Sequence, residues 1–370
     1  MSLRSAGRTT RPTTAVPGRV LMPAVRVGPV SAVRRPRHIV VVVAAIVVAV
    51  AAAIASVGVG EFAISPGRVL EVIIGGGDRR EELVVRSIRL PRVLLGLAVG
   101  AALGLAGAIV QTTARNALAS PDLLGVTAGA SVGAVAVIVL AGDDGQVSGL
   151  LAALGVPAAA LLGGLLAAAA VLLVLRRVGH AGLQPLLVGV GFSAAFGGLV
   201  SWMLIAASVE EASRATVWLT GSLNGRSWTE LWAVASVLAA VLPVLVPLST
   251  RLAAIDLGSD VARGLGVGGV RVQAALLAVA VVLASITAAA AGPIGFVALV
   301  GPHLARLACA APRPPLAASA ATGALLVVVC DLVARTAVPL VQLPVGAVTA
   351  LVGAPFLLWL LIRRRKETGR

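Results

Sequence analysis

Long apolar stretches recur along the whole chain, and they constrain its fold more than any other feature. Several run for roughly 18 residues or more, which is enough for a helix to cross about 30 Å of membrane hydrocarbon. Only helices and closed barrels satisfy backbone hydrogen bonds inside a bilayer, and barrel strands are much shorter than these stretches. The sequence therefore predicts an all-α, polytopic membrane protein.

Composition supports this class. Hydrophobic residues make up 59% of the chain and charged residues 12%, whereas a soluble domain is about 45–50% apolar and about 25% charged. In such a chain the net charge of +15 does not indicate nucleic-acid binding, and we expect the lipid bilayer as its surroundings. The two cysteines, Cys309 and Cys330, form neither a disulfide framework nor a metal-binding spacing, so we expect no metal site.

The pattern predicts about ten transmembrane helices, and these fall near residues 39–59, 92–112, 123–140, 156–175, 184–207, 229–248, 272–291, 294–308, 317–338 and 346–362. Three of them are less regular, since 123–140 is rich in glycine, 294–308 is short and contains Pro302, and 317–338 carries Asp331 and Arg335.

The chain divides into a membrane domain and two short tails. We expect residues 1–37 to be a disordered basic tail, residues 38–365 to form the ten-helix domain, and residues 366–370 to form a C-terminal tail. The first apolar segment could instead be a signal peptide cleaved after residues 53–55. Its basic lead is long for that purpose, which favours a membrane anchor.

The distribution of charge predicts the orientation. With both termini cytoplasmic, the cytoplasmic segments hold 21 basic and 4 acidic residues, and the outer segments hold 9 basic and 11 acidic residues. Cytoplasmic loops of membrane proteins carry the excess of Lys and Arg. This orientation places the unusually long connection at residues 250–269 in the cytoplasm.

Several functional classes lack their motifs. The chain has no G-x-x-x-x-G-K-[ST] phosphate loop and no H-E-x-x-H zinc motif, so neither ATP hydrolysis nor metalloprotease activity is expected of it. Charged residues are scarce within the spans, unlike the proton relay of a coupled carrier. An uncharged bundle with one elaborate cytoplasmic loop is consistent with a transporter driven by a separate motor protein that docks on that loop. An autonomous carrier or channel is the alternative.

Four stretches resemble one family. They are "RLPRVLLGLAVGAALGLAGAIVQTTARNALASPDLLGVTAGASVGA" at 89–134, "IDLGSDVARGLGV" at 255–267, "GPIGFVALVGPHLARL" at 292–307 and "DLVARTAVPLVQLPVGAVTALVGAPFLLWLL" at 331–361. In this order they resemble the FecCD-type permeases, the membrane subunits of ABC importers for ferric siderophores, haem and vitamin B12. The resemblance runs from about residue 39 to 365.

The resemblance implies a bundle like that of the vitamin B12 importer permease, without catalytic residues of its own. It implies a second permease subunit, either an identical copy or a paralogue, and two ATP-binding subunits that hold ATP and magnesium. It also implies an extracytoplasmic substrate-binding protein and a location in the cytoplasmic membrane.

The resemblance assigns the loop at 250–269 to contact with the ATPase. A cap at Asp256 or Ser259 and helix-ending glycines would form a short helix there, and its apolar residues would pack into the partner. The expected coupling residues are Asp256, Leu257, Gly258, Asp260, Val261, Arg263, Gly264, Leu265 and Gly266. The alternative is an amphipathic loop on the membrane surface.

The resemblance also implies two further sites. Arg89, Arg92 and Arg335 would receive acidic residues of the binding protein, although such arginines can also be anchors that reach the membrane surface. The expected pathway and gate residues are Gln111, Asn116, Leu118, Phe192 and Ser193. Ala117 stands where the family usually has proline, which leaves the gate geometry open.

We therefore expect the permease half of a binding-protein-dependent importer for a metal chelate, most readily a ferric siderophore. The alternatives are import of vitamin B12 or haem, an ATP-independent carrier or channel, and a membrane scaffold. The sequence does not specify which chelate is carried or whether the permease pair is a homodimer.

Overall fold

A computed structural model describes residues 24–27, 30–33, 36–60, 63–140, 150–178, 184–256, 264, 269–338 and 341–368. The chain separates into two units, Met1–Pro36 and Arg37–Arg370. In the first unit, β1 (Ala24–Val27) pairs antiparallel with β2 (Val30–Val33). This pair was not expected in a tail interpreted as disordered.

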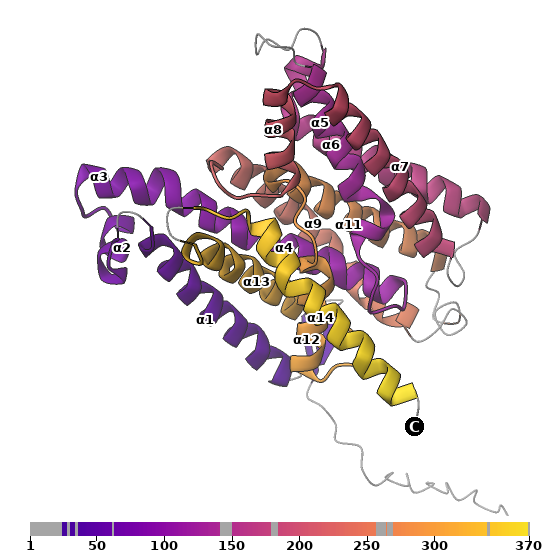
Figure 1. Cartoon of the computed structure of the whole chain (residues 1–370). Coiled ribbons are helices and arrows are strands. Elements are labelled where there is room, and N and C mark those ends of the chain that lie inside the picture. The colour runs from indigo at the N-terminus through magenta and orange to yellow at the C-terminus, as the bar shows by residue number, and fades with distance from the viewer. Residues whose placement is uncertain are drawn as a thin grey trace, which may run out of the picture. The chain divides into compact units, whose positions relative to one another are not determined.

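The described part of the second unit is helical (Figure 1). Its α-helices are α1 (Pro36–Gly58), α2 (Pro66–Ile73), α3 (Arg79–Glu82), α4 (Leu90–Thr113), α5 (Val126–Leu140), α6 (Leu150–Val178), α7 (Gln184–Ala206), α8 (Val209–Leu219), α9 (Trp228–Asp256), α11 (Gly269–Ala291), α12 (Val297–Cys309), α13 (Leu316–Thr336) and α14 (Val345–Thr368). A π-helix, η1 (Leu83–Arg89), precedes α4, and a 3₁₀ helix, η2 (Pro121–Leu124), precedes α5.

The prediction of an all-α, multi-pass membrane fold is confirmed. Among the described residues, seven helices are long and apolar enough to span a membrane, and three shorter apolar helices lie at Val126–Leu140, Val297–Cys309 and Val345–Leu360. Together they correspond in order to the ten expected spans. The short connecting helices α2 and α8 begin with serine caps, and Ser208 forms a capping box with Glu211.

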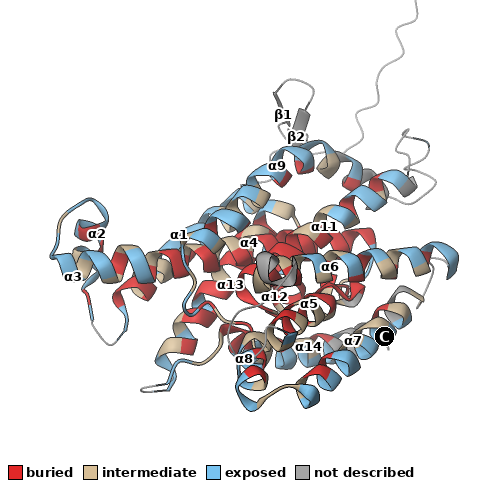
Figure 2. Cartoon of the chain, turned by 90° about the horizontal axis from the view of Figure 1, so that it is seen from above, coloured by how far each residue is buried: buried red, intermediate tan, exposed pale blue. Residues whose placement is uncertain are grey.

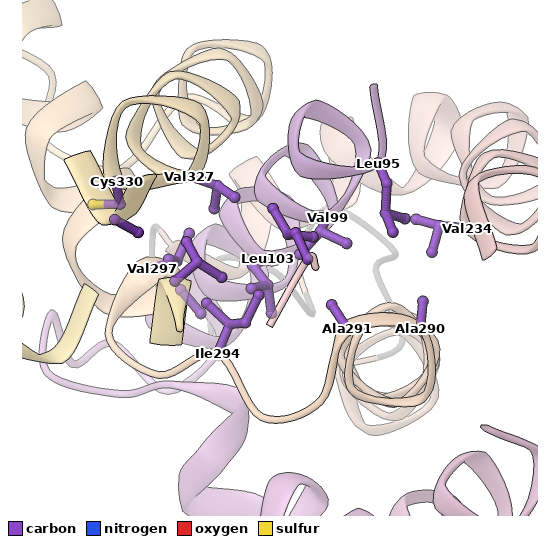
Figure 3. Close-up of a cluster of buried hydrophobic side chains, with 14 of the residues drawn as sticks. Leu95, Val99, Leu103, Val234, Ala290, Ala291, Ile294, Val297, Val327 and Cys330 are labelled. Atoms are coloured by element: carbon purple, nitrogen blue, oxygen red, sulfur yellow. The ribbon is translucent and has the colours of Figure 1, made fainter. Parts of the chain in front are cut away.

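The core is built around α4, which lies beside α13 at the centre of the bundle (Figures 1 and 2). In the most apolar 18-residue stretch of the span Arg79–Thr113, which contains α4, 78% of the residues are buried within the chain. The corresponding share is 17% for α1 and for α7. Leu95, Val99 and Leu103 of α4 pack on side chains from α9, α11, α12 and α13 (Figure 3). The outer helices are therefore left with faces for lipid or another protein.

Small residues allow the central helices to approach closely. Gly100 and Gly104 of α4 lie so near the carbonyl groups of Gly323 and Ser319 on α13 that an added Cβ at either position would collide with backbone. Gly107 meets α12 in the same way, at Ala298. Without a hydrophobic drive between helices in lipid, such close contact is a main source of helix association.

Candidate functional site: an arginine cluster and a proline break

Arg92 and Asp331 form a buried ion pair at the end of the bundle where α1 ends and α4 begins. Only 7% of Arg92 and 2% of Asp331 is exposed. Nε and Nη2 of Arg92 donate to Oδ1 of Asp331 at 3.1 and 2.9 Å. Nη1 donates to Oδ1 of Asn224 at 3.3 Å and to Oε1 of Gln342 at 2.9 Å. Arg92 thus joins α4 to α13 and to the segments before α9 and α14.

Arg335 and Arg89 bind the C-terminal end of α1. Nη2 of Arg335 donates to the carbonyl oxygen of Ser56 at 2.7 Å and also to its hydroxyl group. Nη1 of Arg89 donates to the carbonyl oxygens of Val57 at 2.8 Å and Gly58 at 3.3 Å. Cations at a helix C-terminus satisfy its last carbonyls and interact favourably with the helix dipole.

Asp331 also faces Arg335, one helical turn further along α13. Its Oδ2 lies 3.4 Å from Nε of Arg335, and neither of these two buried atoms has a hydrogen-bond partner. One carboxylate therefore serves two guanidinium groups. We call Arg89, Arg92, Asp331 and Arg335 the arginine cluster.

The π-helix η1 and Pro91 shape the backbone that carries Arg89 and Arg92. The amide of Leu90 donates to the carbonyl of Val85, five residues back. Pro91 has no amide hydrogen to donate to the next carbonyl, that of Arg86. The indole Nε1 of Trp228 donates to that carbonyl at 3.1 Å instead. A tertiary contact thus stabilises the π-helix beside the cluster, and π-bulges are frequent at functional sites.

Backbone hydrogen bonds hold the segments that carry Asn224 and Gln342. The amide of Ser222 donates to Ala291 at the end of α11 at 2.8 Å, and the amide of Gly346 donates to the carbonyl of Gly221 at 3.0 Å. Gly221 has φ of 68° and Gly292 has φ of 73°, a left-handed conformation that favours glycine. The acceptors around Arg92 thus rest on a rigid junction.

The three expected docking arginines are thus brought together, but they are held inside the chain by acceptors that sequence reasoning did not identify. Asp331, Asn224 and Gln342 were not among the expected site residues. Asp331 carried a usable signal, because an ionisable residue within a membrane span usually has a partner and a function. The docking role of the arginines stays a prediction.

At the other end of α4, Gln111 contacts α12. Pro302 lies inside this helix and breaks its hydrogen-bond ladder, because it cannot donate to the carbonyl four residues earlier, that of Ala298. The side-chain Nε2 of Gln111 donates to Ala298 at 3.4 Å and to Leu299 at 3.1 Å. Gln111 is therefore a buried partner of the proline break, and its expected role in the pathway stays a prediction.

His303 follows the proline break and is buried. Its ring meets the ring of Phe356 edge-on, with centroids 5.5 Å apart. This packing agrees with a structural position at the border of the bundle. Among the described residues no group of three or more His, Cys, Asp or Glu side chains is placed to hold a metal ion.

The turn after α4 has a fixed local geometry. Oδ1 of Asn116 accepts a hydrogen bond from the amide of Leu118 at 3.0 Å, an Asx turn. Asn116 is exposed, whereas Ala117 and Leu118 are half-buried. Just beyond, loss of hydration raises the pKa of the Asp122 carboxyl group, and hydrogen bonds from Thr127 and Ser120 act in the opposite direction.

Phe192 and Ser193 lie on α7, and both are half-buried. The ring of Phe192 packs beside that of Phe196, with centroids 5.7 Å apart, and against the cluster of α6 and η2 side chains around Leu124. Gly191, Gly197 and Gly198 on the same helix have no atom within 4 Å of an added Cβ. This leaves an open strip of small residues on α7.

Most of the expected coupling loop lies outside the described residues. The backbone of α9 continues to Asp256, eight residues beyond the expected end of its span at 248, and Gly264 is helical. Leu257, Gly258, Asp260, Val261, Arg263, Leu265 and Gly266 are not described, so their role in coupling stays a prediction.

The chain is similar to known transport permeases over most of its length. Residues 46–363 match the model of the FecCD transport family. The chain is 37% identical over 308 residues to the ferric enterobactin transport system permease protein FepG of Escherichia coli, covering 83% of this chain and 91% of that protein. It is 38% identical over 288 residues to the cobalamin import system permease protein BtuC of Halobacterium salinarum, covering 77% of this chain and 75% of that protein.

The fold agrees with a solved relative. A structure of a metal-chelate type ABC transporter in an inward-facing conformation matches with a TM-score of 0.75 and 27% identity, covering 87% of this chain and 99% of that chain. The match to the family model begins within α1 and ends within α14. The chain belongs to the FecCD transport family.

Proposed function

We propose that this chain is a permease subunit of a binding-protein-dependent ABC importer that moves a metal chelate across the cytoplasmic membrane. The observation that carries the proposal is the match to the FecCD model over residues 46–363, supported by a fold shared with a metal-chelate type transporter. The chain supplies the pathway and undergoes no covalent chemistry. ATP and magnesium are held by a separate subunit.

The proposed substrate is a ferric siderophore. Relatives named for enterobactin and for achromobactin support this class, the latter a permease of Dickeya dadantii that is 38% identical over 319 residues and covers 84% of this chain. The cobalamin permease of Halobacterium salinarum has the same 38% identity but over less of this chain, 77%, which makes vitamin B12 the second candidate. The small, neutral side chains of the bundle favour neither.

The proposed orientation places both termini in the cytoplasm and the arginine cluster on the outer side. The excess of basic residues on the cytoplasmic side supports it. The segment at 250–269 would then face two ATP-binding subunits, and the cluster would face a substrate-binding protein with exposed acidic residues. A second permease subunit, identical or paralogous, would cover the open strip on α7.

Copurification tests this proposal. The tagged chain is isolated in mild detergent from its own host, and everything that accompanies it is identified by mass spectrometry. We expect a stoichiometric ATP-binding subunit and, if the pair is heteromeric, a second FecCD-type permease. Repeated isolation of the chain alone, with transport that does not respond to nucleotide, would favour an autonomous carrier instead.

A further inference from the structure

Arg92 already uses most of its hydrogen-bond donors inside the chain. A guanidinium group has five N–H donors, and four hydrogen bonds from Arg92 go to Asp331, Asn224 and Gln342. An incoming carboxylate binds arginine best through two neighbouring N–H groups. Arg92 cannot offer such a pair unless one of its present acceptors leaves.

Arg335 is held differently by the same carboxylate. Asp331 accepts two hydrogen bonds from Arg92, but it faces Arg335 only across 3.4 Å, without a hydrogen bond. The attraction between Asp331 and Arg335 is therefore one of charge alone. A second carboxylate can therefore pair with Arg335 in place of Asp331 without breaking a hydrogen bond, because Asp331 and Arg335 share none. The same exchange at Arg92 would break two hydrogen bonds.

The charges of the cluster leave room for such a second carboxylate. One carboxylate, Asp331, faces the two guanidinium groups of Arg92 and Arg335, so these three side chains together carry a positive charge. Carbonyl groups of α1 and two side-chain amides bind the arginines but carry no charge. An acidic group from a partner would therefore be attracted to Arg335 and at the same time repelled by Asp331.

We propose that Asp331 is a positioning residue for docking, and that docking is an exchange of carboxylates at Arg335. An acidic side chain of the binding protein replaces Asp331 beside Arg335, while Asp331 stays hydrogen-bonded to Arg92. The repulsion between the two carboxylates weakens the docked state, so that the binding protein leaves after it has delivered its substrate. This inference rests on the proposed importer function.

The exchange predicts that removing the charge of Asp331 strengthens docking. Asp331→Asn keeps the shape and an oxygen that can accept from Arg92, but it no longer competes for Arg335. We expect the Kd for the binding protein found by copurification to fall about tenfold, mainly through slower dissociation. Asp331→Glu keeps the charge on a longer side chain that reaches closer to Arg335, and we expect it to weaken docking.

Two controls separate exchange from a general gain of positive charge. Glu210→Gln on α8 makes the same change of charge away from the cluster and should leave the Kd within about twofold. In an Arg335→Gln background, Asp331→Asn should no longer strengthen docking. The affinities are measured on the intact transporter in nanodiscs, and each variant is first shown to assemble and to melt cooperatively.

The outcomes distinguish the two proposals. Tighter docking of Asp331→Asn that depends on Arg335 supports the exchange. Unchanged or weaker docking of this variant, or the same gain without Arg335, overturns it while the importer function stands. A wild-type transporter to which no binding protein docks would contradict the proposed function, and the exchange would fall with it.

Discussion

At the scale of single residues, the polar side chains of this bundle act mainly by completing hydrogen bonds that the backbone lacks. Gln111 binds the carbonyl of Ala298 that Pro302 leaves open, Trp228 binds the carbonyl that Pro91 leaves open, and Arg89 caps α1. A buried polar group without a partner costs roughly 1–3 kcal/mol. These residues are therefore important for stability whatever further role they have in transport.

Substitution of Gln111 measures this contribution. Gln111→Leu keeps much of the volume but removes the donor to Ala298 and Leu299, and we expect the free energy of unfolding to fall by about 1–3 kcal/mol. The melting temperature of the purified complex in detergent reports the change. Gln184→Leu, at the start of α7, is the control and should change the melting temperature less. An equal effect of both substitutions would mean that Gln111 does not support the proline break.

The arginines show how far single residues could be predicted. The resemblance assigned Arg89, Arg92 and Arg335 to one docking site, and in the structure these three side chains lie at the same end of the bundle. The pairing of Arg92 with its acceptors could not be read from the sequence, because Asp331 and Gln342 lie 239 and 250 positions from it. Only the tertiary fold brings such distant groups together.

At the scale of elements, apolar length alone located every expected span, because the membrane sets the length of a helix that crosses it. The same criterion could not detect the π-helix before α4, since Leu83–Arg89 looks like an ordinary helical start. The span predicted at 229–248 agrees with the apolar part of α9, Trp228–Ser249, while the helix itself continues to Asp256. Connections outside the hydrocarbon are not constrained by length in this way.

The central helix pair gives a prediction at this scale. An alanine Cβ at Gly104 would collide with the carbonyl of Ser319 on α13, and overpacking of this kind typically costs about 1–3 kcal/mol. We expect Gly104→Ala to lower the melting temperature of the complex. Gly67→Ala on α2, where an added Cβ has open space, should leave it unchanged or raise it. Equal tolerance of both would contradict the close packing of α4 on α13.

The open strip on α7 predicts a contact between permease subunits. Gly198 is exposed in the single chain, and Cys309 and Cys330 are both buried. A Gly198→Cys variant should therefore form an oxidant-dependent disulfide or bismaleimide cross-link between two copies of this chain in native membranes. If the second subunit is a paralogue, a cysteine at its matching position supplies the second thiol. Val43→Cys on helix α1, where Val43 is also exposed, is the control and should form no cross-link. Cross-linking at Val43 but not at Gly198 would move the interface to α1.

At the scale of the whole molecule, the bundle is a folded unit with incomplete surfaces. In the most apolar 18-residue stretch of each span, 67% of the residues are buried for α11 and 78% for the span that contains α4. The share is at most 22% for α1, α7 and α9. Lipid can cover such faces, and so can a second permease. The distribution of charge also supports an orientation in the membrane, in which the basic side of the bundle is proposed to face the cytoplasm.

A substitution in the proposed coupling segment tests communication with the ATPase. Gly264 is a described residue of this segment, and among the described residues an added Cβ there meets no atom within 4 Å. The variant tested is Gly264→Trp. We expect it to leave assembly intact while uptake falls at least tenfold relative to ATP hydrolysis. Gly264→Ala is the matched control and should transport normally. Full uptake by the tryptophan variant would argue against coupling through this segment.

Uptake into proteoliposomes tests the central claim most directly. The complex copurified with this chain is reconstituted with its binding protein, and accumulation of a radiolabelled ferric siderophore is measured with ATP, without ATP, and with a non-hydrolysable analogue. We predict accumulation against the gradient only when both hydrolysable ATP and the binding protein are present. Equal accumulation without nucleotide, or without the binding protein, would contradict the account of this chain as an importer permease.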